Sequence, residues 1–233
     1  DKVTGSLELE ATYDNVGFFI EKALGTSATA GPASGLYTHT YTMGDVPVAG
    51  TTLRLQRGTS DYSETFEGVV FNTMTMSCAA GEHMSLSLEM IAETSLDNTP
   101  TTGSARGSTT LTFAAPTNEN LILHHHALTL GWNSQTFTLI DFEYKLENGL
   151  AERMRLGSLI TKQPVQSDYR NATMTVTIET DDVQGYQAFI NDTVGDAIIE
   201  FTNGIESPTA DGRRIIFSCN AAYIESYEDS ISE

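Results

Sequence analysis

The stretch FTLIDFEYKLE, residues 137–147, alternates between apolar side chains and charged or polar ones. One face carries the apolar residues Ile140, Phe142, Tyr144 and Leu146. The opposite face carries the charged residues Asp141, Glu143, Lys145 and Glu147. A period of two is typical of a half-buried antiparallel strand, so the stretch predicts a sheet with one apolar and one acidic face.

The same alternation recurs along the chain. Residues 6–12 place Leu7, Leu9 and Ala11 opposite Glu8 and Glu10. Residues 83–93 place apolar Met84, Leu86, Leu88 and Met90 on one face, with Ser85, Ser87, Glu89 and Glu93 mostly opposite. Residues 172–180 alternate apolar and threonine side chains in the same way. Further strands are expected at residues 36–43, 51–57, 65–78, 121–130, 197–202 and 213–225, which predicts a mainly β, antiparallel chain.

Two segments are predicted to be short flanking helices. Asp14 is expected to cap a helix that runs through Val16, Phe19, Ile20, Ala23 and Leu24 and closes at Gly25. Asp181 or Asp182 is expected to cap a second helix, through Val183, Tyr186, Phe189, Ile190 and Val194, that closes at Gly195. An acidic cap before a helix and a glycine after it are typical boundaries.

The two predicted helices and the strands before them resemble each other. Phe19, Ile20, Leu24 and Gly25 align at constant spacing with Phe189, Ile190, Val194 and Gly195. One interpretation is an internally duplicated strand–helix module, at about residues 6–93 and 172–225, within a single domain of residues 1–233. The other interpretation is that any strand followed by a capped amphipathic helix produces such a match.

Residues 94–110 contain almost no apolar side chain and exceed the length of an ordinary hairpin loop. We expect a long flexible loop there, either disordered or ordered against a partner.

Acid dominates the charge of the chain. Its 233 residues include 31 acidic and 12 basic ones, a net charge of −19, although only 18% of residues are charged. Such a nearly one-signed field repels nucleic acid and other polyanions. The length allows one large β-domain or two small ones.

Features of other protein classes are scarce. Cys78 and Cys219 are expected to be reduced and buried, because their spacing does not indicate a disulfide. No apolar run approaches the roughly 20 residues that span a bilayer, so no membrane contact is expected. The N-terminus lacks a hydrophobic signal core, and Asp1 in place of Met suggests that an initiator or a leader was removed.

No catalytic motif is recognisable, so neither an enzyme nor a cofactor is expected. The most conspicuous cluster is His124-His125-His126, in which two imidazoles would share one face of a predicted strand. A metal would need further ligands, so a polar strand surface or a contact between subunits is favoured over a metal site. Acid pairs such as Asp141 with Glu143 follow strand alternation, which explains them without glycosidase chemistry.

Several stretches share the order and texture of a known family. They are GFFIEKALG at residues 17–25, YTHTY at 37–41, VPV at 46–48, TTLRL at 51–55, Tyr62 and FEGVVFNTMTM at 66–76. Together with the opening strand, the chain resembles over most of its length the tail tube (major tail) proteins of long-tailed bacteriophages. The second predicted helix departs from the simplest such proteins, which have one main helix.

This resemblance implies an antiparallel β-sandwich or split barrel with a small flanking helix. It implies hexameric rings in which each subunit contributes strands to an inner β-barrel, and rings that stack into a tube for DNA ejection. Terminator, tape measure and distal tail proteins are the implied partners, the virion tail the implied location, and the host cytoplasm the implied site of assembly. DNA would pass through the lumen without specific binding.

An acidic lining suits such a channel, because phosphate contacts with a basic lining would trap the duplex. The lumen-lining candidates are Glu89, Glu93, Asp141, Glu143 and Glu147, followed by Glu8 and Glu10. The alternative for each is that it faces outer solvent. Residues 94–110, including Asp97, Asn98 and Arg106, are the candidates for a loop between rings.

Two other readings stay open. The tube of a contractile injection device would share the fold but conduct protein. A secreted β-sandwich that binds carbohydrate or acts as an adhesive module would instead show a cluster of exposed aromatic side chains.

Overall fold

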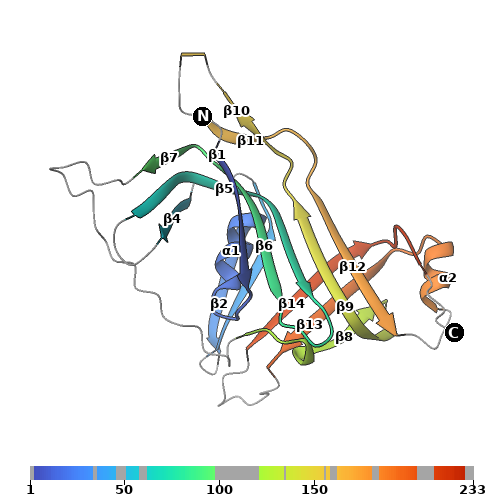
Figure 1. Cartoon of the computed structure of the whole chain (residues 1–233). Helices are drawn as coiled ribbons and strands as arrows, with labels where there is room; N and C mark the ends of the chain where they lie inside the picture. Colours follow the sequence, from blue (N-terminus) through green and yellow to red (C-terminus); the bar gives the residue numbers. More distant parts are fainter. Residues whose placement is uncertain are drawn as a thin grey trace. The chain divides into compact units, whose positions relative to one another are not determined.

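The computed structural model describes residues 3–33, 36–45, 51–57, 62–97, 121–133, 135–154, 156–157, 162–179, 184–203 and 213–228 (Figure 1). Two compact units divide the chain. The first comprises Asp1–Met76, Ser85–Leu121 and Tyr144–Met174, and the second comprises Ser77–Met84, Ile122–Glu143 and Thr175–Glu233. Strands dominate the described residues, which confirms the predicted mainly β class with short helices.

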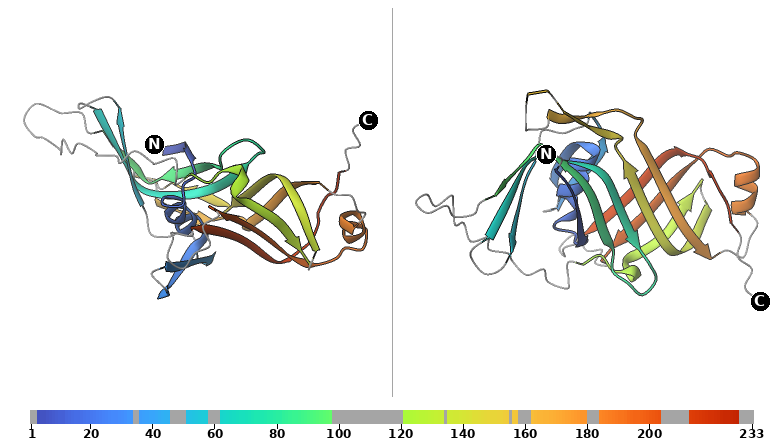
Figure 2. Two further views of the ribbon diagram at one scale, coloured as in Figure 1. Left: turned by 90° about the horizontal axis from the view of Figure 1, so that it is seen from below. Right: turned by 45° about the horizontal axis from the view of Figure 1, so that its top comes forward.

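The sheet of the first unit has the strand order β1-β6-β5-β9. These strands are β1 (Val3–Glu10), β6 (Ser85–Ala92), β5 (Tyr62–Cys78) and β9 (Gln135–Glu147), and the right-hand view of Figure 2 shows β1, β6 and β5 side by side. β12 (Asn171–Glu179) pairs with β9, while β4 (Thr51–Arg57) and β7 (Thr94–Asp97) pair with β5. The register of β1 against β6 sets Leu7 opposite Leu88 and Leu9 opposite Leu86, so apolar faces coincide.

Two separate hairpins and a helix complete the first unit. β2 (Gly25–Ala33) pairs with β3 (Leu36–Met43), and β10 (Leu150–Arg153) pairs with β11 (Lys162–Gln166). α1 (Val16–Leu24) buries Val16, Ile20 and Ala23, whose spacing places them on one helical face. It ends because Gly25 adopts the left-handed conformation, with φ of 102°, and donates its N–H to the carbonyl of Glu21.

The same ten-stranded sheet continues from β9 in the order β9-β8-β13-β14, and these strands belong to the second unit except for the end of β9. Here β8 (Ala127–Trp132), β13 (Gly195–Thr202) and β14 (Arg214–Ala222) pair in antiparallel register. Three buried rings form its core: Phe142 lies 5.5 Å from Phe201 and 4.9 Å from Phe217, between ring centroids. The unit also contains α2 (Gln184–Ile190) and a 3₁₀ turn, η2 (His124–His126).

Asn148 is the main polar anchor of the first unit, and its side chain is 1% exposed. Its amide nitrogen donates hydrogen bonds to the carbonyls of Ala23 and Phe71, both at 2.9 Å. One side chain therefore joins the end of α1 to β5. Buried carbonyls need such partners, since an unsatisfied one is costly.

Arg170 completes this anchor. Its Nε donates to Oδ1 of Asn148 at 2.8 Å, and one terminal nitrogen donates to the carbonyl of Gly44 at 2.8 Å. The other terminal nitrogen donates to the carbonyls of Ala23 and Leu24, both at 3.2 Å. A guanidinium at the C-terminal carbonyls of a helix satisfies them and complements the helix dipole.

Several strand predictions are confirmed by the structure. β3 and β4 span the predicted residues 36–43 and 51–57. The predicted inward residues Met84, Leu86, Leu88 and Met90 are buried.

Other predictions are wrong. The N-cap of α1 is Asn15 rather than Asp14, because Thr12 and Asn15 exchange backbone-to-side-chain hydrogen bonds just before the helix. α2 ends at Ile190 rather than at Gly195, which begins β13 instead. There Asn191 and Asp192 close the last turn, Asp192 with a positive φ of 48°. Asp181 and Asp182 lie outside the described residues.

The predicted strand over residues 121–130 is interrupted, since His124–His126 form a 3₁₀ turn and β8 begins only at Ala127. The first four residues of the predicted long loop, Thr94–Asp97, form β7 and pair with β5. The rest of that loop lies outside the described residues. β2, β10 and β11 were not predicted at all.

We predict that Asn148→Ala lowers the free energy of unfolding of the dilute protein by about 2–4 kcal/mol, because it leaves a buried carbonyl unsatisfied and removes an acceptor from Arg170. Urea denaturation followed by circular dichroism measures the change. Asn171→Ala is the control, since Asn171 is exposed. Equal stability of the two variants would contradict the role of Asn148.

Candidate functional site

A polar surface covers one face of β1 and β6 in the first unit. Because Leu86 and Leu88 are buried, the residues between them point to the other side of the sheet. Across the two strands, Ser6, Glu8 and Glu10 lie opposite Glu89, Ser87 and Ser85. Three carboxylates thus share a face with small hydroxyl side chains.

This surface continues onto β5. Thr73 donates its hydroxyl hydrogen to Oε2 of Glu89 at 3.0 Å. Met74 and Met76 are buried, so Thr73 and Thr75 lie on the polar side. The name first polar face is used for the following residues of β1, β6, β5 and β9: Ser6, Glu8, Glu10, Ser85, Ser87, Glu89, Thr73, Thr75, Lys145 and Glu147.

On β9 the polar alternation holds as well. The backbone N–H of Asn148 donates to the carbonyl of Asn72, which places Glu147 beside Thr73 and Lys145 beside Thr75. The Lys145 ammonium lies 2.7 Å from the Glu147 carboxylate. The first polar face therefore has Glu8, Glu10, Glu89 and Glu147 against one cation, and its charge is negative.

In the second unit, Asp141 and Glu143 are exposed on β9. Oδ1 of Asp141 accepts the backbone N–H of Ala80 at 3.4 Å. On the part of β12 that belongs to this unit, from Thr175 on, the exposed residues are Thr175, Thr177 and Glu179. These segments of β9 and β12, residues 135–143 and 175–179, contain no lysine or arginine. Their exposed acidic and threonine side chains resemble those of the first polar face.

Glu93 lies apart from the other candidates. It follows the end of β6, is half-buried, and donates its backbone N–H to the carbonyl of Glu67. Its side chain lies over Gly68, where φ is 66° and an added Cβ would come within 2.5 Å of Cγ of Glu93. Glu93 thus packs on β5 at Gly68, where the positive φ interrupts the regular strand conformation.

The candidates for a loop between rings are mostly outside the described part of the chain. Asp97 is the last residue of β7. Asn98 and Arg106 lie outside the described residues.

Sequence reasoning missed the hydroxyl members of the first polar face on β5. Thr73 and Thr75 alternate with Met74 and Met76, so the same period of two could have identified them. It also missed Asn148 and Arg170, whose side chains donate to backbone carbonyls that lie 77 to 147 residues away along the chain. No local signal marks such residues.

The three consecutive histidines of η2 contact one another edge to face, with ring planes 85° and 78° apart. Their ring centroids are 5.3 Å apart for His124 and His125, and 4.7 Å apart for His125 and His126. His126 is buried, and its Nδ1 accepts the N–H of Leu123 at 3.3 Å. Burial lowers the pKa of His126 below its ordinary 6.5, and His125 and His124 lower it further. Within the described residues, no group of histidine, cysteine and acidic side chains could hold a metal ion.

Neither cysteine is an activated nucleophile. Both are free thiols, Cys78 buried and Cys219 half-buried. Burial raises the pKa of Cys78 to about 11, with further contributions from the carboxylates of Glu82 and Asp141. Burial also raises the pKa of Cys219. Both therefore stay protonated at neutral pH, and the thiolate is the reactive form.

No helix in the described part of the chain is long and apolar enough to cross a membrane.

The two-faced antiparallel strands with acidic polar surfaces define an acidic, mainly β-protein. A family model described as phage tail tube protein matches residues 2–227 of the 233. The chain therefore belongs to the phage tail tube protein family, whose members are structural proteins of the virion tail and not enzymes. No curated protein matches the chain.

We predict that folding stability falls as the pH drops below about 6.5. His126 stays neutral in the folded protein at a pH where the unfolded chain takes up a proton, so acid favours the unfolded state. Urea titrations at pH 7 and pH 5.5 measure the loss. His126→Asn should reduce this pH dependence, whereas Asn171→Ala, a change at an exposed residue without a titratable side chain, should leave it unchanged. An unaltered pH dependence in His126→Asn would contradict the prediction.

Proposed function

We propose that this tail tube protein assembles into hexameric rings that stack into a tube, and that the tube conducts DNA out of the virion into the host cell. The observation that carries the proposal is the match to the tail tube family over nearly the whole chain. Acidic polar faces on its sheets add a physical reason for passage of DNA without binding.

Free sheet edges support closure of a ring. β1 pairs only with β6 among the described strands, and β12 pairs only with β9. An unpaired edge presents N–H and C=O groups that invite another strand. Pairing of the β1 edge of one copy with the β12 edge of the next would repeat head to tail around a ring and continue the sheet from copy to copy.

The charge of the polar faces supports an inward orientation. Glu8, Glu10 and Glu89 lie together on the first polar face, and Asp141 and Glu143 are exposed in the second unit. Facing a lumen, they would repel the phosphates of the duplex and keep it mobile. Glu147 contributes less, because Lys145 partly neutralises it, and the half-buried Glu93 is the weakest candidate.

Contacts beyond the ring complete the proposal. Residues 94–110, with Asp97, Asn98 and Arg106, would join one ring to the next. Terminator, tape measure and distal tail proteins would bind the tube, which would assemble in the host cytoplasm. The protein needs no cofactor for this role.

We predict that the purified protein forms rings or tubes with a central hole in negative-stain electron microscopy. Sedimentation over a series of protein and salt concentrations should show a hexamer or its multiples. A protein that stays monomeric at high concentration in every salt condition would refute the tube.

We predict that the double variant Asp141→Lys/Glu143→Lys still forms tubes but delivers DNA poorly, because two negative charges per subunit become two positive ones that would bind phosphates along the channel. Complementation of a phage that lacks the gene measures delivery, and microscopy measures assembly. Glu225→Lys/Glu228→Lys is the matched control, since it makes the same charge change at exposed residues near the C-terminus. Unchanged infectivity of the first variant would reject a lumenal position for Asp141 and Glu143.

A further inference from the structure

The β10–β11 hairpin exposes large apolar side chains at its outer end. Met154 is 69% exposed and Leu156 is wholly exposed, directly after β10. Val165, on β11, is 37% exposed. Val165 pairs with Ala151 nearer the base of the hairpin, so Met154 and Leu156 are the apolar side chains at its outer end. A two-stranded hairpin is marginally stable by itself, and large apolar side chains exposed at its end suit contact with a partner.

The hairpin also differs in charge from the rest of the chain. Residues 150–166 contain Arg153, Arg155 and Lys162 but only one acid, Glu152, in a chain of net charge −19. Arg153 is exposed and pairs with Lys162 in the backbone register. A basic, apolar-tipped segment is complementary to an acidic, apolar groove.

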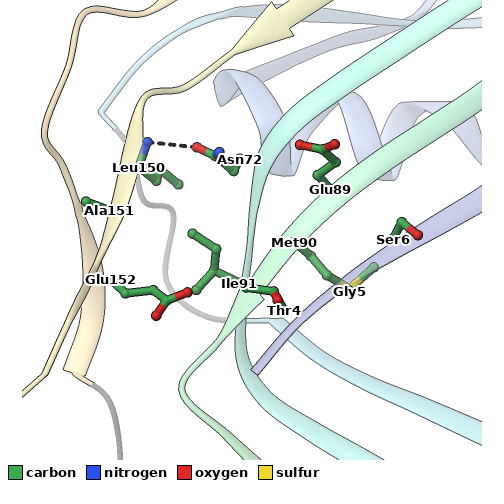
Figure 3. A pocket seen from close by; sticks show the side chains of 10 residues that line it. All are labelled: Thr4, Gly5, Ser6, Asn72, Glu89, Met90, Ile91, Leu150, Ala151 and Glu152. Atoms are coloured by element: carbon green, nitrogen blue, oxygen red, sulfur yellow. Dashed lines mark hydrogen bonds between the residues drawn. The ribbon is translucent and has the colours of Figure 1, made fainter. Parts of the chain in front are cut away.

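Such a groove exists in the first unit (Figure 3). It has a volume of about 680 Å³ and is lined on one side by Thr4, Gly5 and Ser6 of β1. Ile91 and Leu150, which belong to a buried apolar cluster with Val70, contribute its apolar lining. The carboxylates of Glu89 and Glu152 also line it.

The groove is not filled by the end of its own hairpin. β10 starts in the groove, at Leu150, but Met154 and Leu156 are not among the lining residues. The groove is bordered by β1, an edge strand of its sheet, so a neighbouring copy across that edge has access to it.

We propose that the β10–β11 hairpin of one copy docks into the groove of the neighbouring copy, with Met154 and Leu156 against Ile91 and Leu150, and Arg153 beside Glu89. The docked hairpin would cover the Glu89 end of the first polar face and leave Glu8, Glu10, Asp141 and Glu143 as the acids that face the lumen. The inference rests on the proposed assembly into rings. Each copy then gives one hairpin and receives one, which is a heterologous contact that closes in a ring. The docked hairpin would bury apolar side chains between copies, whereas pairing of the β1 and β12 edges would contribute hydrogen bonds.

A cross-linking experiment tests the contact directly. Two single variants, Leu156→Cys and Ser6→Cys, are purified, mixed under assembly conditions and oxidised. Both positions are exposed, so neither substitution disturbs the core. A disulfide-linked dimer that forms in the mixture, and in neither variant alone, is the expected result. The single variants also control for the native Cys78 and Cys219.

Removal of the apolar tip gives a second readout. The variant Met154→Ser/Leu156→Ser should raise the protein concentration needed for assembly by about tenfold or more, the effect of losing buried Leu and Met contacts. Tyr223→Ser, which also removes an exposed large side chain, is the control and should assemble as the wild type does.

The outcomes separate this inference from the proposed function. Rings from the wild type, without the mixed disulfide and with normal assembly of the double serine variant, would overturn hairpin docking and leave the tube intact. Normal assembly in vitro combined with lost infectivity would assign the hairpin to another tail protein and would also overturn docking between copies. Absence of any assembly in the wild type would refute the proposed function itself.

Discussion

The strands β1, β6 and β5 of the first unit meet two environments at once, and this constraint shapes the rest of the structure. Met74, Met76, Leu86 and Leu88 are buried on one side of the sheet. On the other side, Glu8, Glu89 and Thr73 form a hydrogen-bonding, acidic surface. Because successive side chains point to opposite faces, a shift of register by one residue would bury the acids. The polar face is therefore as strongly specified as the core that lies behind it.

A sheet alone does not hold α1 in place, and the polar anchor at Asn148 and Arg170 does so. Together these two side chains satisfy the carbonyls of Ala23, Leu24, Phe71 and Gly44. The carbonyls at the end of a helix have no partner within it, so side chains from elsewhere must supply one. The hydrogen bonds that the charged Arg170 donates are stronger than those of a neutral donor. Together, the hydrogen bonds of Asn148 and Arg170 connect α1, β5 and the turn after β9.

Two features of the single chain favour assembly with further copies: strand edges without a partner strand among the described residues, and exposed apolar side chains. The edges of β1 and β12 lack a second strand among the described residues, and Met154 and Leu156 are exposed to water. Neighbouring copies would resolve both features, the edges through hydrogen bonds and the hairpin through apolar burial. The acids outside the docking groove, Glu8, Glu10, Asp141 and Glu143, would then face water after assembly, so their charge would govern what can pass along that surface.

The sequence by itself determined the features with a local period. Alternation identified the strands at residues 36–43 and 51–57 and the acidic face with Glu8, Glu10 and Glu89, because side-chain direction in a strand depends only on adjacent residues. Gly25 likewise marked the end of α1. Tertiary structure alone decided the 3₁₀ turn at His124–His126, the partners of Asn148 and Arg170, the β10–β11 hairpin and the groove beside β1. These depend on which distant segments pair, and long-range pairing leaves no periodic signal in the residues that it joins.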